Sequence, residues 1–322
     1  MSNRSVRYET RISPSKLALG AGRLGAFWQG HSSRESARTL SAALDAGIRL
    51  IDTADVYALG LSERVIGRVL RQRRAETLLC TKLGQLKTPL STLAAHRASG
   101  SLSLASLRAA IPRRTPVDPT HVPRCFDSAY LRWALGRSLT RLRSPRVDIL
   151  LLHGPTQLDL AARLFEPAIT RALRDGDAAH FGVSCDDADV ALAAAELPYV
   201  SFIELPVDVG HPAERAIVAR LAASGIGVLA RSPFARGELI ARVTRELGLF
   251  DEESAAYCLQ AVTEFPDVFT TIVGMHSPAR VHENVRLLSL PISPRRRAEI
   301  ERALARPSSS EAFSAGPTTS SR

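Results

Sequence analysis

The sequence predicts an α/β protein with a (β/α)8 (TIM) barrel, and three observations favour this fold. Short apolar stretches alternate with amphipathic helical patterns along most of the 322 residues, which indicates parallel strands covered by helices. Eight such strand–helix units can be counted, and a barrel of eight units typically takes about 250 residues plus insertions. The composition, 45% hydrophobic and 23% charged, is ordinary for a globular protein. An open, doubly wound sheet is the second choice because it usually needs fewer strands.

Each element is expected where its pattern occurs. The strands are short apolar runs at Leu17–Gly20, Ile48–Asp52, Thr77–Lys82, Val147–Leu152, His180–Ser184, Val200–Leu205, Gly227–Arg231 and Phe269–Val273. The helices have apolar residues at helical spacing and cover Arg34–Ala46, Ser62–Gln72, Asp127–Arg143, Leu158–Arg174, Asp186–Ala195, Ala213–Ala223, Glu252–Glu264 and Pro278–Leu288. Gly47, Gly176, Gly225 and Gly274 lie between them as helix caps or loop glycines.

Three segments lie outside this repeat. Residues 1–16 are expected to form an N-terminal hairpin that closes one end of the barrel. Residues 85–125, rich in Ser, Pro and Arg, form a long loop after the third strand, and a connection of that length is usually functional or mobile. Residues 307–322 are rich in Ser and Thr and are expected to be a disordered tail. We therefore expect one barrel domain over residues 1–306.

Charge and cysteine usage exclude several classes of protein. The net charge is +10, but the 39 arginines are dispersed and not interleaved with aromatic residues, so we expect no nucleic-acid partner. No apolar run approaches 18 residues and the polar start of the chain shows no signal peptide, so we expect a cytoplasmic protein that does not enter a membrane. The four cysteines are widely spaced and form no CxxC pair, which predicts free thiols and no metal site.

Polar residues at the carboxyl ends of three successive expected strands form a chemically coherent set. The second strand ends in Asp52 and is followed by Tyr57, the third ends in Lys82, and the fourth leads to His153. A lysine ammonium beside a phenol lowers the phenol pKa, and a carboxylate behind the lysine keeps it charged. An imidazole opposite can donate a hydrogen bond to a carbonyl oxygen. These groups would suit a proton donor and an oxyanion site for the reduction of a carbonyl by hydride.

Each of these residues also has an ordinary structural explanation. A lone Asp at a strand end is usually a helix cap, a lone Lys is usually solvated, a lone Tyr usually packs in the core, and His153 could cap its strand. Their conjunction favours the catalytic interpretation. Lys82 adds weight because arginine is 13 times more frequent than lysine in this chain and cannot tune its proton affinity in the same way.

The stretch Gly47–Gly67, with Asp52 and Tyr57, resembles the signature of the aldo-keto reductase superfamily. The pairing of Thr81-Lys82 with the strand that ends at His153 resembles it too. The resemblance covers about residues 5–290. It implies a (β/α)8 barrel that binds NADP(H) in an extended form, and it places a catalytic tetrad on Asp52, Tyr57, Lys82 and His153.

Further matches bear on the cofactor. Ser184 matches a nicotinamide contact of the family, while Cys185 replaces an Asn, Glu204 stands where Gln is frequent, and Arg231 stands where an aromatic residue often stacks on the nicotinamide. The resemblance also implies a backbone-rich pyrophosphate loop with Ser232, Phe234 and Gly237, and adenosine contacts from Arg280, Glu283 and Asn284. Gly274-Met275 replaces the usual Lys-Ser pair, so NADP(H) is preferred and NAD(H) is possible.

Glu204 and Arg231 end adjacent strands, and we expect them to form an ion pair beside the nicotinamide. The Glu204 carboxylate would accept a hydrogen bond from the carboxamide. The Arg231 guanidinium would disfavour the cationic, oxidised cofactor because like charges repel.

The function expected from these residues is reversible reduction of an aldehyde or ketone to an alcohol, with Tyr57 as proton donor to a small-molecule substrate. The alternative is a nicotinamide-cofactor-binding regulatory or structural protein with little turnover. A lyase or isomerase lacks the expected paired carboxylates or metal ligands. Phe27 and Trp28 could line the substrate pocket or pack in the core.

A competing motif is Gly20-Ala-Gly-Arg-Leu-Gly25, a literal GxGxxG after an apolar strand. It would indicate a Rossmann dinucleotide site only if a helix opened at its third glycine. Helical pattern resumes only near Ser33, so we expect this segment to be the first barrel strand and its loop.

Overall fold

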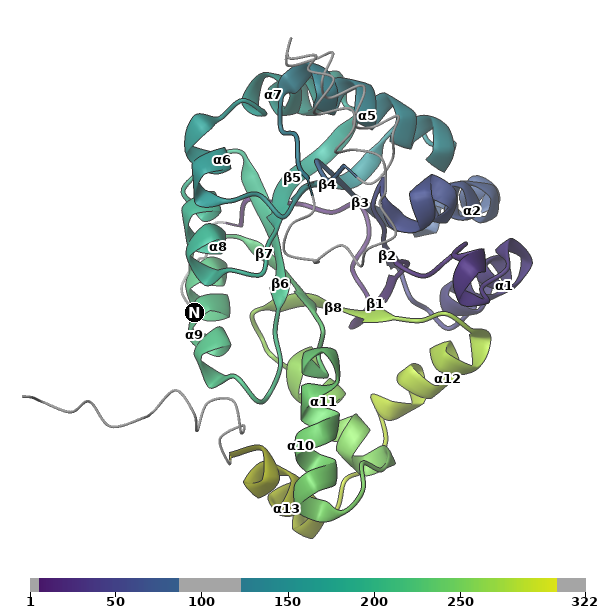
Figure 1. Cartoon of the computed structure of the whole chain (residues 1–322), viewed down its shortest axis with the longest axis vertical. Coiled ribbons are helices and arrows are strands. Elements are labelled where there is room, and N and C mark those ends of the chain that lie inside the picture. Colours follow the sequence, from purple (N-terminus) through teal and green to yellow (C-terminus); the bar gives the residue numbers. More distant parts are fainter. Residues whose placement is uncertain (1–5, 87–122, 306–322) are drawn as a thin grey trace, which may run out of the picture.

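Eight parallel strands close into a barrel in the computed structural model, which describes residues 6–86 and 123–305 (Figure 1). The strands are β1 (Leu17–Gly20), β2 (Leu50–Asp52), β3 (Leu78–Leu83), β4 (Val147–His153), β5 (Ala178–Ser184), β6 (Val200–Pro206), β7 (Gly227–Arg231) and β8 (Val268–Gly274). They pair in chain order, and β8 pairs with β1. The expected barrel is confirmed.

Helices surround this barrel (Figure 1). They are α1 (Ser33–Asp45), α2 (Leu61–Val69), α5 (Ser128–Leu142), α6 (Gln157–Ala162), α7 (Glu166–Asp175), α8 (Ala188–Ala195), α9 (Pro212–Ala223), α10 (Glu238–Leu247), α11 (Glu252–Thr263), α12 (Pro278–Leu287) and α13 (Pro294–Ala305). Side chains of Ser32, Asp127, Asp187 and Ser277 cap the first turns of α1, α5, α8 and α12. These caps satisfy backbone N–H groups that have no partner within the helix.

The structure corrects the helix expected over Leu158–Arg174, which is two helices, α6 and α7. Arg163 ends α6 in the left-handed region, with φ of 52°, and Pro167 stands in the first turn of α7. Proline suits that first turn because its missing N–H would have no helical partner there. The apolar spacing continues across the break, so the sequence pattern alone predicts a single helix.

Two helices were not expected at all. The apolar stripes of α10 and α13 bury Leu239, Val243, Ile300 and Leu304 in a cluster separate from the barrel core. Charged residues cover the other faces of both helices, so the narrow apolar stripe of each helix is difficult to recognise in the sequence. Figure 1 shows α10, α11 and α13 grouped at one side of the barrel.

The expectation of an N-terminal hairpin is wrong for the described part of that segment, because residues 6–16 contain no strand. Side chains close the amino-terminal end of the barrel instead. The Tyr8 ring lies 4.8 Å from Phe202 and 5.3 Å from Phe269. Arg11 pairs with the buried carboxylate of Asp148 at 2.9 Å. Side-chain contacts of this kind let the segment cover the strand ends without pairing with them.

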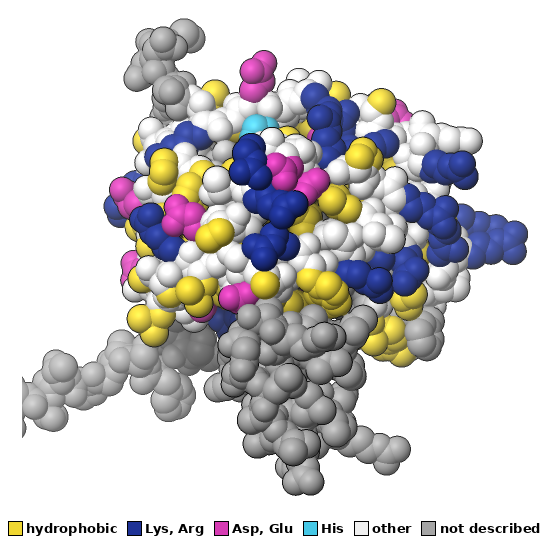
Figure 2. Space-filling model, turned by 90° about the horizontal axis from the view of Figure 1, so that it is seen from above, with side chains coloured by type: hydrophobic (Ala, Val, Ile, Leu, Met, Phe, Trp, Pro, Cys, Tyr) yellow, Lys and Arg dark blue, Asp and Glu magenta, His cyan; other side chains and the backbone are white. Residues whose placement is uncertain are grey.

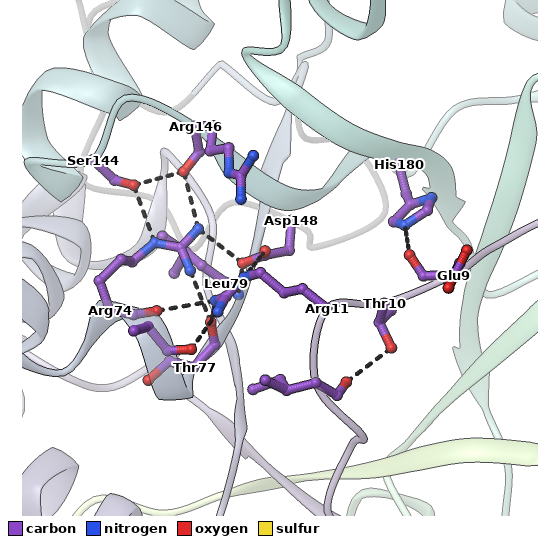
Figure 3. Close-up of polar contacts among 12 residues, drawn as sticks. Glu9, Thr10, Arg11, Arg74, Thr77, Leu79, Ser144, Arg146, Asp148 and His180 are labelled. Carbon is purple, nitrogen blue, oxygen red and sulfur yellow. Dashed lines mark hydrogen bonds and ion pairs between the residues drawn. The ribbon is translucent and has the colours of Figure 1, made fainter.

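Asp148 is the centre of this closure (Figure 3). Its second oxygen pairs with Arg74 at 2.8 Å and accepts a hydrogen bond from the backbone N–H of Leu79 at 2.7 Å. Two guanidinium groups therefore hold one buried carboxylate at the end of the barrel opposite to the strand carboxyl ends.

Residues 87–122, most of the long loop expected after the third strand, lie outside the described residues, as does the tail 307–322. The described ends of the loop meet in an antiparallel bridge between Gln85 and Arg124. Among the described helices, none is both long and apolar enough to cross a membrane.

Basic and acidic side chains lie side by side on part of the surface. On the face shown in Figure 2, acidic side chains lie among basic ones at the centre and left, whereas basic side chains predominate at the right. Exposed ion pairs include Arg171–Asp175 at 3.0 Å and Arg295–Glu299 at 3.1 Å. The absence of a nucleic-acid partner stays a prediction.

Candidate active site

The four residues of the expected tetrad meet at the carboxyl end of the barrel. Asp52 ends β2, Tyr57 lies in the turn that follows, Lys82 lies on β3, and His153 ends β4. The Lys82 ammonium pairs with Asp52 Oδ1 and lies 5.3 Å from the centre of the Tyr57 ring. The rings of Tyr57 and His153 meet edge to face, 5.8 Å apart. A phenol, an ammonium, a carboxylate and an imidazole are thus within contact range.

Burial governs the protonation of this cluster. Lys82 is fully buried. Burial by itself would lower its pKa, but the carboxylates of Asp52 and Glu204 raise the pKa well above its usual range, so the amine stays charged. Burial raises the pKa of Tyr57 to about 12, although the Lys82 ammonium lowers it in part. The sequence predicted the direction of the Lys82 effect but not that burial would exceed it. Tyr57 is therefore a phenol that can donate a proton.

A cavity of about 950 Å³ opens beside Asp52 and Tyr57, whereas His153, Ser184 and Cys185 are not part of its lining. That is large for a ligand site, since such pockets typically span about 300–1,000 Å³. Of the sequence-predicted residues, its lining includes Asp52, Tyr57, Glu204, Arg231, Ser232, Phe234, Gly237, Arg280, Glu283 and Asn284. Lys82 lies fully buried beneath it. One cavity therefore connects the proton donor with the residues expected to bind the cofactor.

The expected ion pair between Glu204 and Arg231 is present. Glu204 Oε1 lies 3.4 Å from Arg231 Nε and accepts a hydrogen bond from Ser184 Oγ at 3.0 Å. Cys185 takes part through its backbone, because its carbonyl accepts from Arg231 Nη2 at 3.1 Å. Its thiol is buried, which raises the pKa of Cys185 to about 12, so that thiol is neutral. Direct contacts of Ser184 and Cys185 with a nicotinamide stay predictions.

The loop between β7 and α10 has unusual backbone geometry. Ser232, Ala235 and Arg236 all have positive φ, from 47° to 58°, a conformation that costs about 1–3 kcal/mol per residue and concentrates at ligand sites. Gly237 follows with φ of 104°, and α10 begins after it without a side-chain cap. Uncapped backbone N–H groups at a helix N-terminus suit a phosphate, which supports the expected pyrophosphate loop.

Basic side chains gather at the other end of the cavity. Arg280 at the start of α12 pairs with Glu283 at 2.7 Å, and Arg23 and His276 line the same space. Burial makes the largest contribution to the lowered pKa of His276, and the nearby His31 and Arg23 lower that pKa further. The sequence analysis missed Arg23 and His276. Their positions just after β1 and β8 are the signal that could have found them, since loops at strand carboxyl ends form such sites.

The GxGxxG segment does not form a Rossmann site. A 3-10 turn at Phe27–Gln29 follows it, and α1 begins only at Ser33. Trp28 is about half exposed (51%) and is not part of the cavity lining among the described residues. The Phe27 side chain lies outside the described part of the structure, so a substrate contact for either residue stays a prediction.

Comparison with known proteins shows which family this chain resembles. The sequence profile of the Aldo/keto reductase family matches residues 16–265. A D-threo-aldose 1-dehydrogenase from Pseudomonas sp is 28% identical and covers 89% of this chain and 93% of its own length. A pyridoxal 4-dehydrogenase from Microbacterium luteolum is 26% identical, covering 86% and 90%.

Solved structures show the same fold. An aldo-keto reductase from Bacillus halodurans superposes with a TM-score of 0.67 at 22% identity, covering 91% of this chain and 93% of that one. One from Klebsiella pneumoniae, in complex with NADP and acetate, gives 0.66 at 20% identity, covering 94% and 96%. With the family profile matching well over half of its length, the chain belongs to the aldo/keto reductase family.

Proposed function

We propose that this protein is an NADP-dependent oxidoreductase that reversibly reduces an aldehyde or ketone to an alcohol, with Tyr57 as proton donor. The observation that carries the proposal is the meeting of Tyr57, Lys82, Asp52 and His153 beside a cavity of about 950 Å³. No pair of these groups is close in the sequence except Asp52 and Tyr57, so the barrel must bring them together.

The cavity fits a nicotinamide dinucleotide. Ser184, Glu204 and Arg231 would hold the nicotinamide end, and the strained loop 232–237 with the uncapped start of α10 would hold the pyrophosphate. Arg280, with Arg23 and His276, would hold the adenosine end. The two guanidinium groups there, those of Arg280 and Arg23, favour a 2′-phosphate because guanidinium groups bind phosphate bidentately. This arrangement supports NADP(H) over NAD(H), although the Lys-Ser pair of the family is absent.

Each catalytic group has a defined part. When bound, the reduced cofactor supplies the hydride. His153 donates a hydrogen bond to the substrate carbonyl and orients it. Tyr57 gives its phenolic proton to the oxygen as negative charge develops there. Lys82, kept charged by Asp52, stabilises the phenolate that remains. In the oxidative direction, Tyr57 takes the proton back.

The substrate is expected to be small and polar. The names of two relatives, a D-threo-aldose 1-dehydrogenase and a pyridoxal 4-dehydrogenase, support a hydroxylated aldehyde or the corresponding alcohol. The open mouth of the cavity carries charged side chains such as Arg236 and Glu252, which agrees with a polar ligand.

The test is turnover by the full chain and by Tyr57→Phe. Wild type should oxidise NADPH with members of a panel of aldehydes and ketones. Tyr57→Phe should lower kcat by about 10²–10⁴-fold, the usual contribution of a general acid, while NADPH binding by fluorescence titration stays near the wild-type level. Tyr257→Phe is the matched control, because this tyrosine contacts Glu301 between α11 and α13 and should leave kcat unchanged. Cofactor binding without turnover on any carbonyl would favour the regulatory alternative.

A further inference from the structure

Lys82 lies between two carboxylates. Besides Asp52, Glu204 Oε2 lies 3.1 Å from its Nζ, and Glu204 is only 2% exposed. Carboxylate oxygens of Asp52 and Glu204 lie within 4.8 Å of one another. Two buried anions this close repel strongly unless a cation separates them. The Lys82 ammonium is that cation. Burial, together with the charge of Glu204, raises the pKa of Asp52 to about 7, so above that pH the ammonium is shared by two anions.

The ion pairs continue from Glu204 to the surface. Its other oxygen faces Arg231 at 3.4 Å, and Arg231 also pairs with Asp186. Asp186 is exposed and pairs with Arg236 at 3.0 Å. Charges of alternating sign therefore run from the fully buried Asp52–Lys82 pair to the rim of the cavity.

The two departures from the family pattern balance one another. The resemblance places a neutral Gln at 204 and an aromatic residue at 231, whereas this chain has a carboxylate and a guanidinium in contact. Arg231 alone would add a positive charge beside Lys82, and Glu204 alone would add a negative one. A buried charge that loses its partner is strongly destabilising, so each residue requires the other.

We propose that Glu204 is a positioning residue that acts as a second counter-ion of Lys82 and thereby weakens the hold of the ammonium on the phenol of Tyr57, while Arg231 limits this effect by sharing the same carboxylate. The proposal rests on Tyr57 being the proton donor of the proposed function. Its consequence is that the tyrosine keeps the proton it donates up to a higher pH.

The groups that face Tyr57 come from five strands or their ends. They are Asp52 on β2, Lys82 on β3, His153 on β4, Glu204 on β6 and Arg231 on β7. The Cys80 thiol, also on β3, is neutral because burial raises its pKa. Burial makes the largest contribution to the raised pKa of Tyr57. Glu204 raises that pKa further, and Arg231 lowers it. The two residues should therefore shift the ionisation of Tyr57 in opposite directions.

The experiment is a pH titration of the full chain labelled with ¹³C at the tyrosine ring carbon that bears oxygen, with the Tyr57 signal assigned by its loss in Tyr57→Phe. Five tyrosines keep the spectrum simple. Glu204→Gln should ionise Tyr57 at a pH lower than wild type by about one unit, as expected for removal of a nearby charge. Arg231→Gln should move the ionisation to higher pH, and the double variant should lie between them.

Asp148→Asn is the matched control, because it also removes a buried carboxylate paired with arginine, at the opposite end of the barrel. It should lower the melting temperature without moving the Tyr57 titration. A Glu204→Gln titration that superimposes on wild type would overturn the proposal, as would shifts of both single variants in the same direction. If Glu204→Gln does not fold, Arg231→Gln tests the proposal. A shift of the Tyr57 ionisation to higher pH supports it, and a shift to lower pH overturns it.

A second readout uses catalysis. In Glu204→Gln, kcat/KM for reduction should begin to fall at a pH lower than in wild type, by the same interval as the Tyr57 titration moves. The titration needs no substrate. If wild type reduces no carbonyl, the proposed function fails while the titration still tests the role of Glu204.

Discussion

Gly182→Ala is expected to destabilise the barrel severely, because β5 and β6 come together at this residue. Gly182 pairs with Phe202, and the register of the two strands shifts between Phe181 and Gly182. An added Cβ would lie 2.0 Å from the backbone oxygen of Phe202, 2.7 Å from its carbonyl carbon and 2.9 Å from Leu151 Cδ2. Two of these three atoms belong to the backbone of a central strand, so they cannot move aside as a flexible side chain could.

The magnitude follows from how far the strands must separate. Ordinary contact begins at 3.4 Å, so the Phe202 oxygen must retreat by 3.4 − 2.0 = 1.4 Å. Such a shift breaks neighbouring ladder hydrogen bonds, at about 1 kcal/mol each, and adds about 1–3 kcal/mol of overpacking. Together these effects amount to roughly 3–5 kcal/mol, or a drop in Tm of about 10 °C for a domain of this size.

Thermal and urea unfolding monitored by circular dichroism would measure the change. Gly136→Ala is the matched control, because an added Cβ on this helical glycine of α5 meets nothing within 4 Å. It should stabilise the protein by about 0.5–1 kcal/mol through helix propensity. Ser184, two residues beyond Gly182, holds Glu204, so any folded Gly182→Ala protein should also have weakened activity. A Gly182→Ala variant as stable as wild type would refute the reasoning.

Three further outcomes are expected. Because the pKa of Tyr57 is raised to about 12, kcat/KM for reduction should stay level to about pH 10 in an NADPH absorbance assay, and a fall that begins near neutral pH and is absent in Tyr57→Phe would contradict this. Arg231→Leu should bring the affinities for reduced and oxidised cofactor closer together in calorimetric titrations, since the guanidinium repels the cationic ring; an unchanged ratio would defeat the idea. Burial raises the pKa of Glu214 from 4.5 to about 7, so the folded chain binds its proton more tightly than the unfolded chain and stability falls as pH rises through that window. Glu214→Gln should flatten that part of the curve of Tm against pH, and an identical slope would count against the assignment.

Local sequence patterns were sufficient to predict the barrel strands and the positions of Asp52, Tyr57, Lys82 and His153 at or near their carboxyl ends. Each expected strand was found to within about two residues, because a strand buried on both faces needs an apolar run and the surrounding glycines and helix caps mark its ends. Lys82 and His153 could be predicted for the same reason, since residues at the carboxyl end of a barrel strand lie at the catalytic face wherever the strand sits in the closed sheet. Sequence spacing also placed Glu204 and Arg231 at the ends of neighbouring strands, and this is why their ion pair could be predicted.

The contact between Lys82 and Glu204 was decided only by the tertiary structure. They lie on β3 and β6, which are not neighbours in the sheet, and closure of the barrel sets which side chains of separate strands share one layer of its interior. The break between α6 and α7, the α10–α13 cluster and the closure around Asp148 likewise depend on contacts between distant segments. A pattern within one segment determines which face is buried, whereas the partner on that face, and with it the charge balance around Tyr57, exists only once the chain has folded.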